Sequence, residues 1–253
     1  MTKKSYAKVN IFLKIAGRRE NYHELVSRFV RVKNLYDIVS FESCNCSEFT
    51  LEGDFGCKTQ QNTIYKAYLV LADQFKCVKE YFKNHKVIVE KKIPEFAGLG
   101  GGSSNCAIFM NMVNEVCNLH LSKDELASIG AIIGADVPFF IYEYDSANVT
   151  GIGEIVKKFD EEALDIETVT PKVQCNTGEI FLEFREKFYK EISPLESKIL
   201  LDVKSRDILK SMNINEANDL YDPAISCYPY LKYYAKDGWY FSGSGSGFFR
   251  IKE

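Results

Sequence analysis

Pro94-Glu95-Phe96-Ala97-Gly98-Leu99-Gly100-Gly101-Gly102-Ser103-Ser104-Asn105 is the stretch that decides how the chain is interpreted. It places four glycines and two serines between an apolar, strand-like stretch at residues 86–90 and a segment whose apolar residues recur at helical spacing. Because glycine has no Cβ, the backbone of such a loop can turn several N–H groups toward one anion. The helix that follows adds the positive end of its dipole. The stretch therefore predicts a phosphate-binding loop.

A flexible glycine-serine linker is the competing interpretation of the same stretch. Linkers have polar flanks without a pattern, whereas both flanks here are apolar, with Ala107, Met110 and Val113 at helical spacing. Two familiar nucleotide loops also do not fit. No Lys-Ser or Lys-Thr follows the last glycine, and Ser103 stands where a dinucleotide-binding loop needs its third glycine.

The composition of the 253-residue chain is that of an ordinary globular protein. Its formal net charge of −3 gives no basic field that would gather nucleic acid. No uninterrupted apolar run approaches the ~20 residues of a membrane helix, and no apolar segment follows Lys3 and Lys4 as in a secretory signal. We therefore expect a cytoplasmic protein without nucleic-acid or membrane partners, in which all eight cysteines are reduced thiols.

Two further segments carry polar residues suited to phosphoryl transfer. Residues 5–15 alternate as a strand does, so Lys8 and Asn10 share one face about 7 Å apart. Asp136 lies in a turn ahead of an apolar stretch at residues 139–141 that we expect to be a strand. The reaction needs a cation and usually a base near the attacking hydroxyl, and Lys8 and Asp136 are the candidates. Each also has a structural interpretation, Lys8 as a solvated lysine and Asp136 as a turn or N-cap residue.

A second glycine-serine stretch occupies residues 242–247, near the end of the chain. Aromatic residues stand on both sides of it, at 239–241 and at 248–249. Aromatic side chains on both sides of a loop favour burial against other elements, which a free tail would not require. We therefore expect a tight loop between two packed elements.

Together these segments resemble the GHMP kinases, the superfamily of galactokinase, homoserine kinase and mevalonate kinase. Residues 94–104 are similar to its loop of Pro, Gly-Leu-Gly and Ser-Ser, and residues 242–246 look like its C-terminal glycine motif. Within it the chain resembles the kinases that act on 4-diphosphocytidyl-2-C-methyl-D-erythritol. Four segments carry this resemblance in chain order: residues 7–13, 21–25, 98–105 and 134–140. The chain departs from that pattern at Glu95 and Phe96, where small residues are usual, and at Asn21, where glycine is usual.

The resemblance implies a role for each of several residues. Asp136 would be the base for the acceptor hydroxyl, and Lys8 would lie beside it. Asn10 would lie in the substrate site. Tyr22 and His23 would hold the cytosine. Their rings can stack on a base, and their polar edges can recognise it by hydrogen bonds. Taken alone, His23 has the plainer interpretation of a surface or structural histidine.

Further expected site residues follow from the same resemblance. A second aromatic ring usually completes the cytosine site, and we expect it to be Phe181, from its place in the C-terminal region. The C-terminal glycine motif adds four expected substrate-site residues: Ser242, Gly243, Ser244 and Gly245. The residues expected to bind ATP are Glu95, Phe96, Ala97, Gly98, Leu99, Gly100, Gly101, Gly102, Ser103, Ser104 and Asn105. Mg²⁺ is expected to bridge the ATP phosphates, with Ser103 or Ser104 as its protein ligand.

The implied fold is α+β with two lobes and the active site between them. Residues 1–150 would form a ribosomal-S5-like lobe with the glycine loop, and residues 151–253 an α/β sandwich. The implied reaction moves the γ-phosphoryl group of ATP to the 2-hydroxyl of the cytidyl substrate, in the non-mevalonate isoprenoid pathway. Two alternatives stay open: another GHMP kinase, of homoserine or mevalonate type, and a non-catalytic nucleotide-binding protein on the same fold. Both a monomer and a homodimer are compatible with the sequence.

Overall fold

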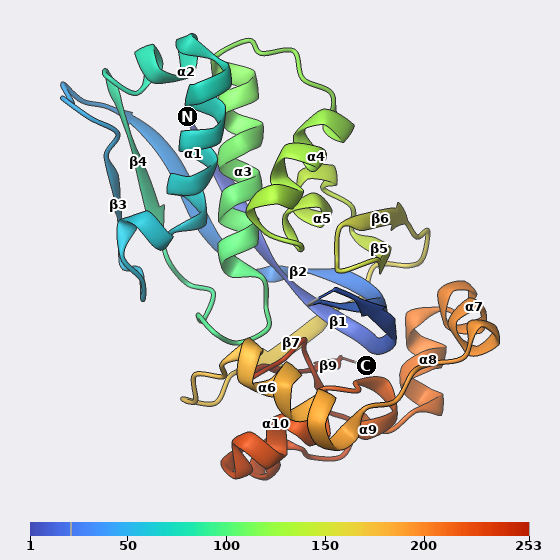
Figure 1. The fold of residues 1–253 in the computed structure, drawn as a ribbon. Coiled ribbons are helices and arrows are strands. Elements are labelled where there is room, and N and C mark those ends of the chain that lie inside the picture. The colour runs from blue at the N-terminus through green and yellow to red at the C-terminus, as the bar shows by residue number, and fades with distance from the viewer. Residues whose placement is uncertain (21, 253) are drawn as a thin grey trace. The chain divides into compact units, whose positions relative to one another are not determined.

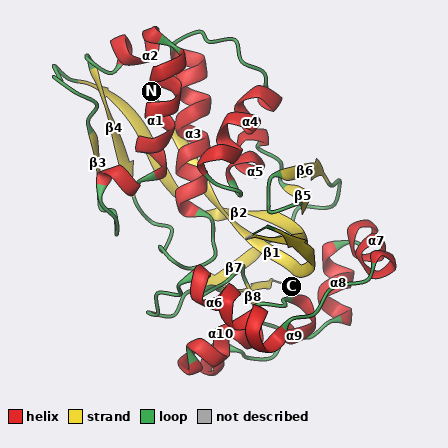
Figure 2. Cartoon of the chain, viewed as in Figure 1, coloured by secondary structure: helices red, strands yellow, loops and turns green. Residues whose placement is uncertain are grey.

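The computed structural model describes residues 1–20 and 22–252 of the chain. These residues form two compact units, and both mix helices with strands, as the predicted α+β class requires (Figures 1 and 2). Unit 1 contains residues 1–7, 35–93 and 101–143. Unit 2 contains residues 8–34, 94–100 and the chain from residue 144 onward. The division near residue 150 into two lobes stays a prediction, and Asn21 lies outside the described residues.

The sheet of unit 1 is built on β2 (Tyr22–Ser43) and β4 (His85–Glu90), which pair antiparallel with Ile38 opposite Glu90. β3 (Leu51–Gly53) adds to β4 in parallel, and the start of β1 (Thr2–Arg19) belongs to the same unit. The strand expected at residues 86–90 is therefore confirmed as β4. It leads directly toward the glycine loop.

Unit 1 has five helices among the described residues, and one of them, α3 (Gly101–Val116), contains the second half of that loop. The five are α1 (Thr63–Gln74), α2 (Lys76–Tyr81), α3, α4 (Lys123–Ile133) and α5 (Val137–Tyr142), with a 3₁₀ turn at Thr59–Gln61. The predicted helix after the glycine loop is thus confirmed as α3. α1 and α3 run side by side (Figure 1), and Phe109 of α3 packs edge-on against Phe41 of β2, with ring centroids 5.7 Å apart.

The predicted strand after Asp136 is wrong, because residues 137–142 form the helix α5. Pro138 fits this helix, since proline is accepted in a first helical turn, where its missing N–H has no partner to lose. An apolar run of this length does not distinguish a buried strand from a buried helix. Val137 through Ile141 are all buried, so burial rather than alternation explains the composition.

Unit 2 contains the rest of β1 and β2, to which β5 (Ser146–Thr150) and β6 (Ile155–Lys158) are added in antiparallel order. A separate antiparallel sheet has the order β7 (Ile166–Val169), β9 (Phe248–Ile251), β8 (Tyr240–Phe241). Its helices are α6 (Thr177–Glu183), α7 (Pro194–Asp202), α8 (Ser205–Ser211), α9 (Ile214–Ala217) and α10 (Tyr221–Cys227), with a π-helical turn at Phe184–Phe188 and a 3₁₀ helix at Pro229–Tyr234.

The glycine-serine stretch at residues 242–247 joins β8 to β9 and is buried along its whole length. Phe241 and Phe248 pair across the two strands with ring centroids 5.2 Å apart. The Ser242 amide donates to the Gly247 carbonyl at 2.9 Å and closes the loop. The predicted tight loop between packed elements is confirmed.

The cysteines differ in part from expectation. Cys44 and Cys46 form a disulfide, so the prediction that all eight are reduced thiols is wrong for this pair. The Cα atoms of this pair lie 5.5 Å apart, within disulfide reach. The free cysteines are Cys57, Cys77, Cys106, Cys117, Cys175 and Cys227.

Across the described residues, no helix is both long enough and apolar enough to pass through a bilayer. The expected cytoplasmic location stays a prediction. The oligomeric state, monomer or homodimer, stays open as in the sequence analysis.

Candidate active site

Lys8 and Asn10 begin the candidate site on β1, in unit 2. Their side chains are 3% and 2% exposed, so the interpretation of Lys8 as a solvated lysine is wrong. The Lys8 ammonium donates to Asn10 Oδ1 at 2.7 Å, and Asn10 Nδ2 donates to the Ser27 hydroxyl at 3.0 Å. The ammonium also lies 4.5 Å from the centroid of the Phe29 ring. The sequence predicted that Lys8 and Asn10 share one face of the strand. It did not predict the buried hydrogen bonds from Lys8 to Asn10 and from Asn10 to Ser27, which fix the position of the Lys8 charge.

The first half of the glycine loop meets the loop at residues 242–247, also within unit 2. Ser242 Oγ donates to the Gly98 carbonyl at 3.0 Å, and the Gly247 amide donates to the Ala97 carbonyl at 2.9 Å. Gly98 has φ +67°, and a Cβ on it would overlap the carbonyl of Ser242. Only glycine satisfies both conditions, so this residue sets how closely the two loops approach.

Gly243 brings these two loops to the β1 residues. A Cβ on Gly243 would lie 3.3 Å from Gly98 Cα and 3.5 Å from Asn10 Oδ1. The Lys8 amide donates to the Leu99 carbonyl at 2.9 Å. Residues expected in the site from three distant segments therefore converge within unit 2.

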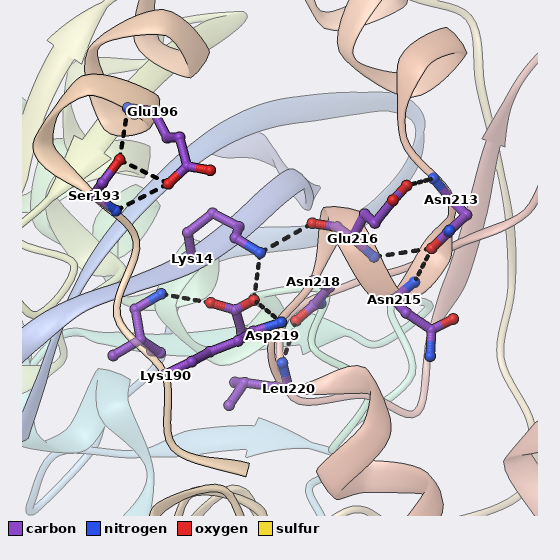
Figure 3. Close-up of polar contacts among 11 residues, drawn as sticks. Lys14, Lys190, Ser193, Glu196, Asn213, Asn215, Glu216, Asn218, Asp219 and Leu220 are labelled. Carbon is purple, nitrogen blue, oxygen red and sulfur yellow. Dashed lines mark hydrogen bonds and ion pairs between the residues drawn. The ribbon is translucent and has the colours of Figure 1, made fainter.

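Asn218 and Asp219 are two residues that the sequence did not single out. Asn218 is 2% exposed, and its Nδ2 donates to the carbonyls of Phe241 at 3.0 Å and of Gly243 at 2.9 Å. Asp219 accepts from the Ile15 amide at 2.9 Å, and Figure 3 shows Lys14 and Lys190 directed at its carboxylate. The pair thereby connects β1 to the loop at residues 242–247. Asn-Asp after a short helix has no distinctive sequence signal, since such residues are common at helix ends.

The second half of the glycine loop opens α3 in unit 1. Ser104 is 1% exposed, and its hydroxyl accepts from Ser5 Oγ at 2.7 Å, whereas Ser103 is only partly buried. Thr63 Oγ1 donates to the Gly102 carbonyl at 2.7 Å. Asn105 is buried, and its Nδ2 donates to Asp37 at 3.0 Å. Of the two serines expected at the metal, Ser103 therefore has the more accessible hydroxyl.

Two of the three residues in which the chain departs from the family pattern, Glu95 and Phe96, are exposed. Glu95 faces solvent, and Phe96 is 49% exposed with φ +53°. Ala97 and Leu99, in contrast, are 2% and 1% exposed, so their side chains belong to the core. The predicted contact of all these residues with ATP is not tested by the structure.

Asp136 lies in unit 1, at the N-cap position of α5. Among the described residues its side chain makes no capping hydrogen bond to that helix, so the N-cap interpretation does not apply. It is partly buried. Lys8 belongs to unit 2, and its pairing with Asp136 stays a prediction.

Tyr22, His23 and Phe181 line one cavity of about 330 Å³ in unit 2, together with Thr177 and Arg185. The rings of His23 and Phe181 are stacked, with centroids 5.2 Å apart and planes 20° apart. Tyr22 is 61% exposed at the rim. The structure thus brings together three residues that we expected around a cytosine, although Phe181 is far from the other two in sequence.

His23 has a buried polar atom without a hydrogen-bond partner in the described part of the chain. Its Nε2 is buried and has no hydrogen-bond partner among the described residues. Burial lowers the pKa of His23 below its ordinary value of 6.5, and the charges of Arg18 and Arg185 lower it further. The lowered pKa favours the neutral imidazole near pH 7, in which one ring nitrogen can accept a hydrogen bond.

Thr177 connects this cavity to the loop at residues 242–247. The hydroxyl of Ser244 lies 2.7 Å from Thr177 Oγ1, and Thr177 lines the cavity. Ser244 is 8% exposed. Of the four residues expected from the C-terminal glycine motif, Ser244 is thus the one tied to the aromatic cavity, and Ser242 and Gly243 are the ones tied to Gly98.

Comparison with known proteins defines the class first. Residues 62–144 match the model of the GHMP kinases N terminal domain. The fold is that of the mevalonate kinase of Methanococcus jannaschii, with a TM-score of 0.61 at 15% identity over 100% of this chain and 90% of that one. A solved 4-(cytidine 5'-diphospho)-2C-methyl-D-erythritol kinase superposes with a TM-score of 0.75 at 27% identity, over 100% of this chain and 90% of that chain. The predicted GHMP kinase fold is confirmed.

Relatives of known name narrow the class. The 4-diphosphocytidyl-2-C-methyl-D-erythritol kinase of Sulfurimonas denitrificans is 54% identical over 99% of this chain and 96% of its own length. The enzyme of that name from Sulfurovum sp. is 46% identical over 98% of each chain. The chain belongs to the 4-diphosphocytidyl-2-C-methyl-D-erythritol kinase family of small-molecule kinases, as the sequence motifs predicted.

Proposed function

We propose that this chain transfers the γ-phosphoryl group of ATP to the 2-hydroxyl of 4-diphosphocytidyl-2-C-methyl-D-erythritol, in the non-mevalonate route to isoprenoid precursors. The products are the 2-phosphate and ADP. The observation that carries the proposal is identity of 54% with a kinase of that name along nearly the whole chain. The cavity that contains Tyr22, His23 and Phe181 supports the acceptor half of the proposal independently of any name.

The aromatic cavity suits a pyrimidine base for two reasons. The faces of His23 and Phe181 offer stacking surface, which contributes about 1–3 kcal/mol per base. The buried Nε2 of His23 has no hydrogen-bond partner among the described residues, and a polar group of the ligand that reaches it once the stack has opened would supply one. A cavity lined by the faces of aromatic rings suits a flat ligand.

The stack must open for the base to enter between its rings. A base between two rings needs about 7 Å, two contacts of about 3.5 Å each, whereas the His23 and Phe181 centroids lie 5.2 Å apart. Phe181 lies on α6, a short helix next to a π-helical turn. We infer that Phe181 moves and His23 stays, because His23 is held in β2 and only 9% exposed.

The glycine loop would hold the ATP phosphates through backbone N–H groups at the start of α3. The residues assigned to this contact are those at 95–105, with Ala97 and Leu99 acting through their backbone. Mg²⁺ would be held by phosphate oxygens and the Ser103 hydroxyl, because Ser104 is already bonded to Ser5. When bound, the ion would draw negative charge away from the phosphoryl group during transfer.

Asp136 would accept the proton of the acceptor hydroxyl, and Lys8 would stabilise the negative charge of the transferring group. The support for Lys8 is its fixed ammonium, which donates to Asn10 at 2.7 Å. The acceptor would be positioned by five residues of unit 2: Asn10, Ser242, Gly243, Ser244 and Gly245.

ADP release from purified protein with Mg²⁺ and ATP tests the proposal, with and without the cytidyl acceptor. Strong release that depends on this acceptor, and not on homoserine or mevalonate, is the expected result. Release with homoserine or mevalonate would favour the other GHMP kinases. ATP binding without turnover on any of these acceptors would favour the non-catalytic alternative.

A further inference from the structure

Asp37 is a fully buried carboxylate in unit 1 that the motifs did not indicate. It lies on β2 at 0% exposure, one residue before the pairing of β2 with β4 begins at Ile38. A buried carboxylate is stabilised only when its oxygens are well bonded. Its partners therefore show what it is there to hold.

Those partners lie at the two ends of the glycine loop, at residues 91–93 just before it and at Asn105, its last residue. Asp37 Oδ1 accepts from the Lys92 amide at 2.6 Å and from the Ile93 amide at 2.8 Å. Oδ2 accepts from Lys91 Nζ at 2.5 Å and from Asn105 Nδ2 at 3.0 Å. One side chain therefore holds the residues just before the loop and the last residue of the loop, which lies in α3.

The strand alone does not fix the start of the loop. The pairing of β2 with β4 ends at Glu90, and Pro94 has no N–H to donate. The amides of Lys92 and Ile93 are therefore the last backbone donors before the loop, and both are bonded to Asp37. Asp37 thus fixes the backbone of the segment that follows the last β2–β4 residue pair.

The segment that Asp37 holds also supports the first residue of α3. A Cβ on Gly101 would lie 2.9 Å from Ile93 Cγ2 and 3.4 Å from Lys91 Nζ. The start of α3 therefore rests directly on the two residues that Asp37 orients. A shift of this segment would move the N–H groups at the start of the helix.

We propose that Asp37 is a positioning residue for ATP, which acts by fixing both flanks of the glycine loop and so the direction of its N–H groups. The inference rests on the proposed ATP site of that loop. Ligand-binding groups need to be held to about 0.5 Å, and a single buried anchor that holds both flanks meets this need. Asp37 does not itself touch the nucleotide.

The sharpest variant is Asp37→Asn. It keeps the size and the Oδ1 acceptor for the two amides, and it replaces the anionic oxygen that holds Lys91 and Asn105. Asn105 Oδ1 has no partner among the described residues, so its amide can rotate to accept from the new amide group. The variant should therefore fold while losing the ion pair to Lys91.

The measurement is calorimetric titration with Mg²⁺ and ATP in the absence of acceptor. Asp37→Asn should bind ATP about tenfold more weakly, the scale of one charge-assisted hydrogen bond, and the KM for the cytidyl acceptor should change less than about twofold. Amide hydrogen exchange at Lys92 and Ile93 should be faster than in the unaltered protein. Asp73→Asn is the matched control, because it removes the same charge from an exposed position in the same unit.

Folded Asp37→Asn with unchanged ATP affinity would overturn the proposal, and so would equal losses for ATP and acceptor. Should this variant lack a thermal unfolding transition, Asp37→Glu, which keeps the charge but displaces it, must show the ATP-selective loss. Failure of both to fold would also overturn it, because the carboxylate would then support the whole unit. If the unaltered protein binds ATP but does not phosphorylate the cytidyl acceptor, the proposed function fails and this inference stands.

Discussion

The glycine loop and the aromatic cavity, the two proposed ligand sites, are built in different ways. The loop at residues 94–105 is one continuous stretch that offers mainly backbone, and its pattern is visible in the sequence. The cavity combines Tyr22 and His23 of β2 with Phe181 of α6, more than 150 residues further along the chain. A site made of backbone is readable from local spacing, whereas a site made of side chains from distant elements requires the tertiary structure.

The largest effect should come from Asp136, which lies outside both regions. Asp136→Asn should lower kcat by a factor on the order of 10² or more, the scale of general-base catalysis. Binding of ATP and of the acceptor should be unchanged, since neither region is altered. Steady-state kinetics with calorimetric binding checks this, and retention of kcat would contradict the assignment of the base.

A test of the loop by itself is Gly98→Ala. A Cβ there would overlap the Ser242 carbonyl, so we expect ATP affinity to fall by a factor on the order of 10–10² as the two loops separate. Gly238→Ala is the matched control, because Gly238 has φ +73° but no atom within 4 Å of the added Cβ. Both variants carry the same backbone strain, and only the first fills occupied space. Equal ATP affinity in the two would show that the contact between the loops does not matter.

The cavity is tested by His23→Ala. Loss of stacking should raise the KM for the cytidyl acceptor about tenfold and leave the KM for ATP unchanged. His120→Ala, an exposed position in unit 1, is the control for loss of an imidazole elsewhere. A similar rise in both KM values would mean that His23 supports the fold, and the distinction between the two regions would be lost.

The smallest effect is a pH dependence confined to the cavity. Burial lowers the pKa of His23, so its neutral form should persist as pH falls through 6.5, and kcat/KM for the acceptor should decline only below that lowered value. Arg18→Gln removes one of the charges that lower the pKa and should move this acid limb to higher pH. The contribution of neutral His23 to folding stability changes in the same direction. It is complete above pH 6.5 and is lost as the pH falls toward the folded-state pKa. If the pH profile of kcat/KM for the acceptor does not shift in Arg18→Gln, His23 is not the titrating group.

The sequence predicted much of the fold because several of its signals are local. The loop, α3 and the buried turn at residues 242–247 each follow from glycine chemistry or spacing within a short stretch. The family followed from four motifs in order. Local signals failed at α5, where an apolar run of six residues fits a helix and a strand equally well.

The supporting residues of the site could not be predicted, because their partners are distant in the chain. Asp37 is 68 residues from Asn105, and Asn218 is 25 residues from Gly243. An aspartate within a strand and an asparagine after a short helix have no spacing that distinguishes them from surface residues. Phe181 could be selected only through the family, which requires a second ring, and its stacking on His23 became visible in the structure.

The central claim is that the cytidyl group is recognised separately from the phosphoryl donor, and one kinetic comparison tests it most directly. ADP release should be measured with the intact cytidyl acceptor and with methylerythritol 4-phosphate, which lacks the cytidyl group, for the unaltered protein and for His23→Ala. The account predicts that the unaltered protein strongly prefers the intact acceptor and that His23→Ala reduces this preference. Equal rates on both acceptors in the unaltered protein would contradict it.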